Sequence, residues 1–192
     1  PPWNVRVTVA PPPTADPGVD FDICAGENAP LSGTMGGSGV THVWGTSGDG
    51  FFDNPNLNNA TYTPGPGDLG NNSVTLTFST DDAGSCPTTF DQLVLTIDDA
   101  PTVDAGIDFA ICEGDAPILS GVIGGSTSTG TWSTFGSGTF DDNTLMTATY
   151  TPDPSDISCG SVVLMLTTDD PIGVCNAINE TVTITIYPMP AL

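Results

Sequence analysis

Two stretches of this 192-residue chain have nearly the same sequence, and this internal repeat limits the possible folds more than any other feature. When the sequence is shifted by 88 residues, residues 13–82 align with residues 101–170 without a gap, and 36 of the 70 positions are identical. One inserted residue then changes the offset to 89, which aligns Cys86 with Cys175. A segment that occurs twice at this length is a structural unit, so the sequence predicts two domains of the same fold.

The repeat also indicates where the domains begin and end. We place repeat 1 at residues 13–99 and repeat 2 at residues 100–188. Residues 1–12 contain an alternating apolar segment followed by prolines, as the end of repeat 1 does. We therefore expect them to be the closing strand and linker of a preceding repeat, and residues 189–192 to be the start of the next linker. The chain is interpreted as a slice of a longer array.

Alternation of apolar and polar residues with a period of two predicts β-strands throughout each repeat. In residues 73–79, for example, Val74, Leu76 and Phe78 share one face and threonines occupy the other. Threonine is β-branched and polar, which suits the solvated face of an antiparallel strand. The strands expected in repeat 1 are residues 20–24, 30–35, 40–46, 51–53, 59–63, 73–79 and 89–97. Short strands separated by turn residues, with almost no helix, predict an all-β fold of two tandem Ig-like (PKD-like) β-sandwich domains with about seven short strands each.

The charge of the chain excludes several classes of partner. Lys and Arg together number 1 against 23 Asp and Glu, so the net charge is −22. Arg6 alone cannot neutralise a row of phosphates, so no nucleic acid is expected as a partner. No apolar run reaches the length of a membrane span, so no membrane insertion is expected. A hydrophobic content of 38% is nevertheless sufficient for a folded core.

Four of the five cysteines are related by the repeat, because Cys24 aligns with Cys112 and Cys86 aligns with Cys175. The simplest arrangement is one disulfide in each repeat, Cys24–Cys86 and Cys112–Cys175. The fifth, Cys159, has no counterpart in repeat 1, so it is either an unpaired thiol or an interchain link. Disulfides form in oxidising compartments, so the protein is expected to be extracellular.

The acidic residues recur at matched positions in both repeats, as Asp53 and Asp141 do. Recurrence favours turns, caps or ions that belong to the repeat over a single catalytic centre, so no enzyme is predicted and no cofactor is required. Calcium is the one metal that the composition suits, since it prefers oxygen ligands. Its candidate ligands are Asp98, Asp99 and Asp104 at the domain junction. Asp is also a common turn former, so both interpretations stay open.

The loop around residues 47–59 differs between the repeats and is where ligand specificity would reside. The candidates for a ligand contact are Asp49, Phe51 and Phe52.

Several motifs resemble known domains. Residues 44–50 (WGTSGDG) and 60–64 (ATYTP) are similar to the W-x-x-G-D-G and following motifs of PKD domains, although one residue is added before Gly48. A more specific resemblance is to the PKD-like repeats of Bacteroidetes, and it covers practically the whole chain. Its motifs stand in repeat 2 as residues 101–106, 111–114, 119–121, 124–126, 130–132, 138–140, 148–152 and 161–170.

This resemblance implies an Ig-like sandwich in very long cell-surface or secreted proteins, including SprB-like gliding adhesins exported by type IX secretion, and implies no catalytic residues. The favoured hypothesis is a structural repeat segment of a long extracellular adhesin or surface filament, acting as a disulfide-stapled acidic stalk or spacer. Its partners would be neighbouring repeats of the same chain and, in a filament, other copies. The alternative is a glycan-binding or protein-binding Ig-like module of a secreted protein.

Overall fold

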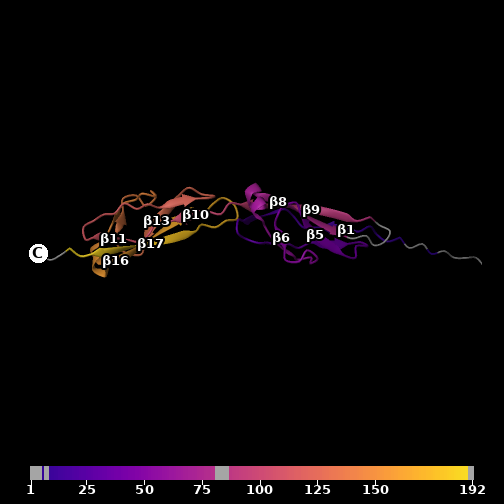
Figure 1. Ribbon diagram of the computed structural model, residues 1–192, viewed down its shortest axis with the longest axis horizontal. Coiled ribbons are helices and arrows are strands. Elements are labelled where there is room, and N and C mark those ends of the chain that lie inside the picture. The colour runs from indigo at the N-terminus through magenta and orange to yellow at the C-terminus, as the bar shows by residue number, and fades with distance from the viewer. Residues whose placement is uncertain (1–5, 7–8, 81–86, 190–192) are drawn as a thin grey trace, which may run out of the picture. The chain divides into compact units, whose positions relative to one another are not determined.

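The computed structural model describes residues 6, 9–80 and 87–189, and the chain divides into two compact units, residues 1–98 and 99–192. Each unit contains one repeat and is built from β-strands, with one short helix among its described residues (Figure 1). The all-β fold with two tandem Ig-like sandwiches is therefore confirmed.

The elements of repeat 1 are β1 (Thr14–Asp16), β2 (Phe21–Cys24), β3 (Ala29–Pro30), β4 (Thr34–Gly36), β5 (His42–Thr46), β6 (Phe51–Phe52), β7 (Thr61–Thr63), α1 (Pro66–Asn71), β8 (Ser73–Thr80) and β9 (Thr89–Asp98). The elements of repeat 2 are β10 (Thr102–Asp104), β11 (Phe109–Cys112), β12 (Val122–Gly124), β13 (Gly130–Thr134), β14 (Thr139–Phe140), β15 (Tyr150–Thr151), α2 (Pro154–Cys159), β16 (Ser161–Thr168) and β17 (Asn179–Tyr187).

The described residues of repeat 1 form more strands than the seven expected, and several of these strands have only two or three residues. The expected strand 30–35 is divided into β3 and β4, with Gly33 in the gap between them. A Cβ atom on Gly33 would lie 2.8 Å from ring carbons of both Trp44 and Phe78, so the backbone passes directly against the core there. Helices α1 and α2 have six residues each, which is too few to produce a helical periodicity in the sequence.

Each repeat is organised around a four-stranded sheet, ordered β2-β9-β8-β5 in repeat 1 and β11-β17-β16-β13 in repeat 2. Strands β8 and β9, both labelled in Figure 1, form a long antiparallel pair. Strand β2, in contrast, pairs with β9 in parallel, so that Cys24 stands opposite Asp98. Repeat 2 has the same parallel pair, with Cys112 opposite Tyr187. The second layer of repeat 1 is the sheet β3-β7-β6.

Alternation along the long strands fills the core as the sequence predicts. Val74, Leu76 and Phe78 of β8 are buried while the threonines between them are partly exposed, and β16 has the same burial pattern. The ring centroids of Trp44 and Phe78 lie 4.7 Å apart in a tilted arrangement that is typical of favourable aromatic pairs. Burial of these large side chains provides the main stabilisation of each domain.

Candidate functional site

Two of the three residues expected to contact a ligand, Asp49 and Phe52, make contacts within the domain. The Phe52 ring packs on Tyr62 with centroids 4.9 Å apart and on Trp44 with centroids 6.4 Å apart, so Phe52 belongs to the core. Phe51 precedes it on the opposite face of β6 and is 65% exposed. Phe51 is therefore the candidate that solvent or a partner can reach.

Asp49 holds the first turn of helix α1. Its two carboxylate oxygens accept hydrogen bonds from the backbone N–H of Gly67 at 2.9 and 3.0 Å, and one of them accepts from Asp68 N–H at 3.2 Å. The N-cap residue of this helix is Gly65, which has no side chain to fulfil that role. A carboxylate at this position satisfies N–H groups that have no partner within the helix.

Repeat 2 caps its helix in another way. The N-cap of α2 is Asp153, whose carboxylate accepts a hydrogen bond from Ser155 N–H at 2.9 Å. The loop residue that corresponds to Asp49 is Ser137. The sequence difference between the two loops thus exchanges one capping carboxylate for another, and the structure shows Asp49 in a capping role.

A buried carboxylate lies behind this loop. Asp68 is only 2% exposed and accepts hydrogen bonds from the hydroxyl of Tyr62 at 2.6 Å and from the backbone N–H of Gly65 at 3.0 Å. The backbone N–H groups of Gly50, at 3.1 Å, and Asp49, at 3.3 Å, also donate to it. We call Asp68, Tyr62 and these N–H donors the carboxylate cluster. It ties the β5–β6 loop, strand β7 and helix α1 to one charged group.

The same cluster occurs in repeat 2. Asp156 accepts hydrogen bonds from Tyr150 at 2.8 Å and from the backbone N–H groups of Ser137, Gly138 and Asp153, each at 3.0 Å. The sequence shows that acidic residues recur in the two repeats but does not by itself reveal this role. The available signal was the constant spacing of six residues between the tyrosine and the aspartate in the two repeats.

The clusters change the acidity of their members in ways that follow from burial and hydrogen bonding. Burial raises the pKa of Tyr62 to about 12, and its hydrogen bond to Asp68 contributes to the rise. Desolvation of Asp156 opposes ionisation, but hydrogen bonds from Ser137, Asp153 and Tyr150 outweigh it and hold the pKa of that carboxyl below its ordinary value. Asp156 is therefore a structural anion at neutral pH.

The calcium hypothesis gains no support from the residues that the structure describes, among which no group of three His, Cys, Asp or Glu side chains could hold a metal ion. Asp104 accepts a hydrogen bond from Gly106 N–H at 2.8 Å, as Asp16 does from Gly18 N–H in repeat 1. Both are turn residues. Asp98 ends strand β9, and Asp99 is the first residue of the second unit.

The expected disulfide Cys112–Cys175 is wrong. Cys112 is a free, exposed cysteine, whereas Cys175 is disulfide-bonded. Cys112 stands opposite Tyr187, the last residue of β17, while Cys175 precedes the first residue of that strand. The two cysteines therefore belong to opposite ends of β17, whose nine residues span about 27 Å.

The expected disulfide Cys24–Cys86 involves a residue outside the described part of the chain. Cys24 is disulfide-bonded and stands opposite Asp98, the last residue of β9. Cys86 itself lies outside the described residues. The fifth cysteine, Cys159, ends helix α2 as a free, exposed thiol.

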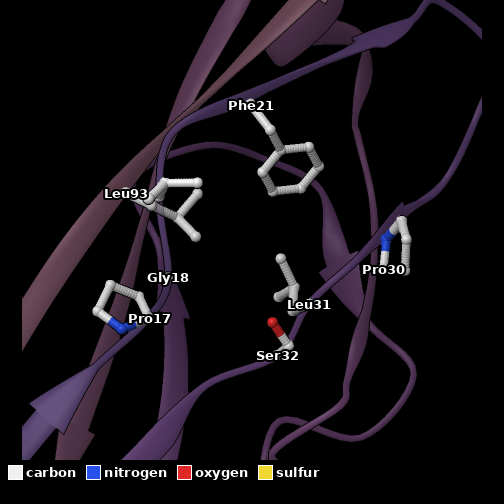
Figure 2. A pocket seen from close by; sticks show the side chains of 8 residues that line it. Pro17, Gly18, Phe21, Pro30, Leu31, Ser32 and Leu93 are labelled. Atoms are coloured by element: carbon white, nitrogen blue, oxygen red, sulfur yellow. The ribbon is translucent and has the colours of Figure 1, made fainter.

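A shallow apolar hollow of about 250 Å³ lies on repeat 1 (Figure 2). Phe21, Leu31 and Leu93 point toward it, and Ser32 contributes the hydroxyl seen at its edge. In repeat 2 the sequence places isoleucines where the lining residues Val19 and Pro30 stand. A hollow of this composition can hold an apolar group, and its lining contains no titratable side chain.

No family model and no curated protein sequence matches this chain. Among solved structures, the insect immune protein hemolin aligns with a TM-score of 0.53 and 14% identity, over 93% of this chain and 47% of hemolin. Drosophila N-cadherin EC1-4 aligns with a TM-score of 0.47 and 10% identity, over 91% of this chain and 49% of that one. This chain spans about half the length of each. The likeness to hemolin shows the fold, a pair of tandem Ig-like β-sandwiches.

Neither helix of the described residues is long and apolar enough to cross a lipid bilayer.

The first prediction concerns the buried carboxylate of repeat 2. Asp156→Asn replaces an acceptor of four hydrogen bonds by an amide, and it should lower the free energy of unfolding of repeat 2 by about 2 kcal/mol at pH 7. Because the pKa of Asp156 is lowered by folding, its contribution is present above the unfolded pKa of about 3.9 and is lost as pH falls through the folded value. The difference between variant and parent should therefore shrink in acid.

Urea unfolding at pH 7 and pH 3 measures this effect, with Trp132 fluorescence followed in a Trp3→Phe, Trp44→Phe background. Glu113→Gln, which changes a half-buried carboxylate that accepts one hydrogen bond, from Met189 N–H at 3.3 Å, is the control and should alter stability little. An Asp156→Asn variant as stable as the control at pH 7 contradicts the assigned role.

The second prediction tests whether Asp49 caps helix α1. Asp49→Ala should destabilise repeat 1 by about 1 kcal/mol, the usual cost of losing a cap. The matched change Ser137→Ala should leave repeat 2 nearly unchanged, because Asp153 caps α2 and the backbone N–H of residue 137 remains. Urea unfolding followed by Trp44 or Trp132 fluorescence measures each repeat. Equal effects of the two substitutions would count against the capping role.

Proposed function

We propose that this chain is a structural repeat segment of a long extracellular adhesin or surface filament, in which it acts as an acidic, disulfide-containing spacer. The observation that carries this proposal is the duplication of the whole internal framework, including the buried carboxylates Asp68 and Asp156. A binding or catalytic protein needs its site once, whereas a spacer gains length with each copy of the same module. The proposal assigns the chain no catalytic role.

Chemistry supports an extracellular location. Cys24 and Cys175 are disulfide-bonded, and such bonds persist in oxidising surroundings. The net charge of −22 makes copies of the module repel one another, which opposes pairing of exposed strand edges. An array of such modules stays extended and soluble without a large hydrophobic interface.

The identity proposed for the parent protein comes from the motifs that resemble Bacteroidetes PKD-like repeats. On that basis the parent protein is a SprB-like gliding adhesin or a related surface protein that uses type IX secretion. Residues 1–12 then belong to the closing strand and linker of a preceding repeat, and residues 189–192 to a following linker. The hemolin structure is described as having implications for homophilic adhesion, and by analogy other copies of the chain are proposed as partners beside the neighbouring repeats.

Electron microscopy tests the proposal, with gold-labelled antibodies raised against this chain and applied to intact cells that make it and to their medium. Label along thin strands that leave the cell surface is the expected result for a stalk. Label along thick, regularly repeating fibres supports the filament form of the same proposal. Label that requires opening the cells contradicts an extracellular role.

The exposed ring of Phe51 favours one alternative, a module that binds a glycan or a protein. In repeat 2 a threonine, Thr139, stands at this position, so the ring would make the site specific to repeat 1. If the chain is a spacer, it should show no saturable binding on a glycan array, and Phe51→Ala should bind like the parent. Saturable binding that is lost in Phe51→Ala and kept in the matched variant Thr139→Ala would replace the spacer by the binding module.

A further inference from the structure

A second hollow, of about 440 Å³, lies on repeat 2 between helix α2, the loop after β13 and the first half of β16. Its lining includes Phe135, Ser137, Ser155, Asp156 and Val163. Phe135 is 71% exposed, whereas Asp156 is buried behind the lining. This repeat-2 hollow therefore combines an exposed aromatic ring, hydroxyl groups and a carboxylate.

Sequence differences between the repeats leave the hollow open. At the position of Ser137, repeat 1 has Asp49, whose carboxylate lies against the first turn of α1 and accepts hydrogen bonds from Gly67 N–H. A Cβ atom on Gly67 would lie 3.1 Å from the carboxylate carbon of Asp49, so a glycine there leaves room for that side chain. Repeat 2 has Ser155 in place of this glycine and caps its helix with Asp153. The shorter Ser137 thus leaves open on α2 the surface that Asp49 covers on α1.

The exposure of Phe135 also arises from a difference between the repeats. Phe135 N–H donates to Val163 O at 3.0 Å, as Ser47 N–H does to Thr75 O, so the backbone contact is the same in both repeats. In repeat 1 the Ser47 hydroxyl also accepts a hydrogen bond from Thr75 N–H at 3.1 Å, which holds that side chain against β8. A phenylalanine cannot accept such a bond, and its ring lies exposed beside the hollow.

The outer face of the sheet extends this apolar edge. Val163 and Met165 are half-buried on the outer face of β16, where they alternate with fully buried residues. Phe135 is the cross-strand neighbour of Val163. Repeat 2 therefore has an apolar strip of Phe135, Val163 and Met165, where repeat 1 has a serine and two threonines.

The charge around the hollow favours a cation. Gly136, which is part of the lining, passes so close to the buried carboxylate that a Cβ atom on it would overlap Asp156 Oδ1. The Ser155 hydroxyl donates to Asp153 at 2.8 Å, which brings a second carboxylate to the rim. Carboxylates that are partly shielded from water attract a cation strongly, and the face of an aromatic ring attracts it as well.

We propose that the repeat-2 hollow binds a segment of another protein in which one arginine or lysine is flanked by apolar residues. The cationic group lies on the Phe135 ring, near Asp156, with the hydroxyls of Ser137 and Ser155 as acceptors. The flanking apolar side chains pack on the rest of the apolar strip. The proposal does not depend on the spacer role, because a spacer can have a binding site on one side of one repeat.

A peptide titration of the isotope-labelled chain, followed by two-dimensional NMR, tests the proposal. The probe is a tripeptide of leucine, arginine and leucine with both ends blocked. It should shift the amide signals of Phe135, Ser137 and Val163 saturably and leave those of Ser47 and Asp49 in place. The same peptide with glutamine in place of arginine should bind about tenfold more weakly. Added salt should weaken the arginine peptide, since it screens the carboxylates.

Variants of Phe135 separate recognition of the cation from simple apolar contact. Phe135→Ser, which introduces the residue of repeat 1, should abolish saturable binding. Phe135→Leu keeps an apolar side chain without the ring, so it should weaken the arginine peptide about fivefold and the glutamine peptide little. Phe135→Tyr should bind like the parent. The control is Phe51→Ala, which removes the exposed ring of repeat 1 and should change nothing.

Three results overturn the proposal. Equal affinity for the arginine and glutamine peptides would mean that the hollow takes apolar groups without regard to charge. Unchanged binding in Phe135→Ser would mean that the cation follows the acidic surface as a whole. Shifts of the same signals when the chain is concentrated without peptide would mean that a second copy covers this face. None of these results bears on the spacer role, which microscopy tests separately.

Discussion

The parallel pairing of the second strand of each repeat with its last strand is the constraint from which the rest of this structure follows. In an antiparallel hairpin the turn brings the end of one strand to the start of the next, but β2 runs in the same direction as β9. The end of β2 therefore lies where the chain leaves the repeat. This one choice of direction places Cys24 beside Asp98, the last residue of β9, and not beside Thr89, with which that strand begins.

The buried carboxylates fix the conformation of the loops at one end of each sandwich. An ionised carboxylate inside a protein is costly unless it is fully hydrogen-bonded, and Asp68 meets this requirement with a tyrosine hydroxyl and backbone N–H groups. Since those donors come from a loop, a strand and the start of a helix, the cluster holds the end of the sandwich in one conformation. The loops of the two repeats can then differ in sequence, as Asp49 and Ser137 do, as long as some carboxylate caps the helix.

These features explain how a domain of fewer than a hundred residues that carries a large negative charge keeps one conformation. Burial alone leaves small domains only marginally stable, so polar clusters and covalent links matter more in them than in larger ones. The charge resides on the surface, where water and salt screen it, while the anions inside are matched by donors. A module with this design can be repeated without change, which is the property that a spacer requires.

The sequence by itself determined the division into two repeats, the all-β fold and the positions of the long strands, because apolar alternation in segments such as Ser73–Thr80 directly encodes which face is buried. It also identified the cysteines as candidates for disulfides and the recurring aspartates as structural residues of the repeat. Only the tertiary structure decided that Cys112 is free and which aspartates are buried. Alternation is the same for parallel and antiparallel neighbours, so the sequence pattern contains no information on strand direction. Likewise, the burial of Asp68 and the capping by Asp49 depend on groups brought together from 18 or 19 residues away, and that proximity exists only once the sheets have packed.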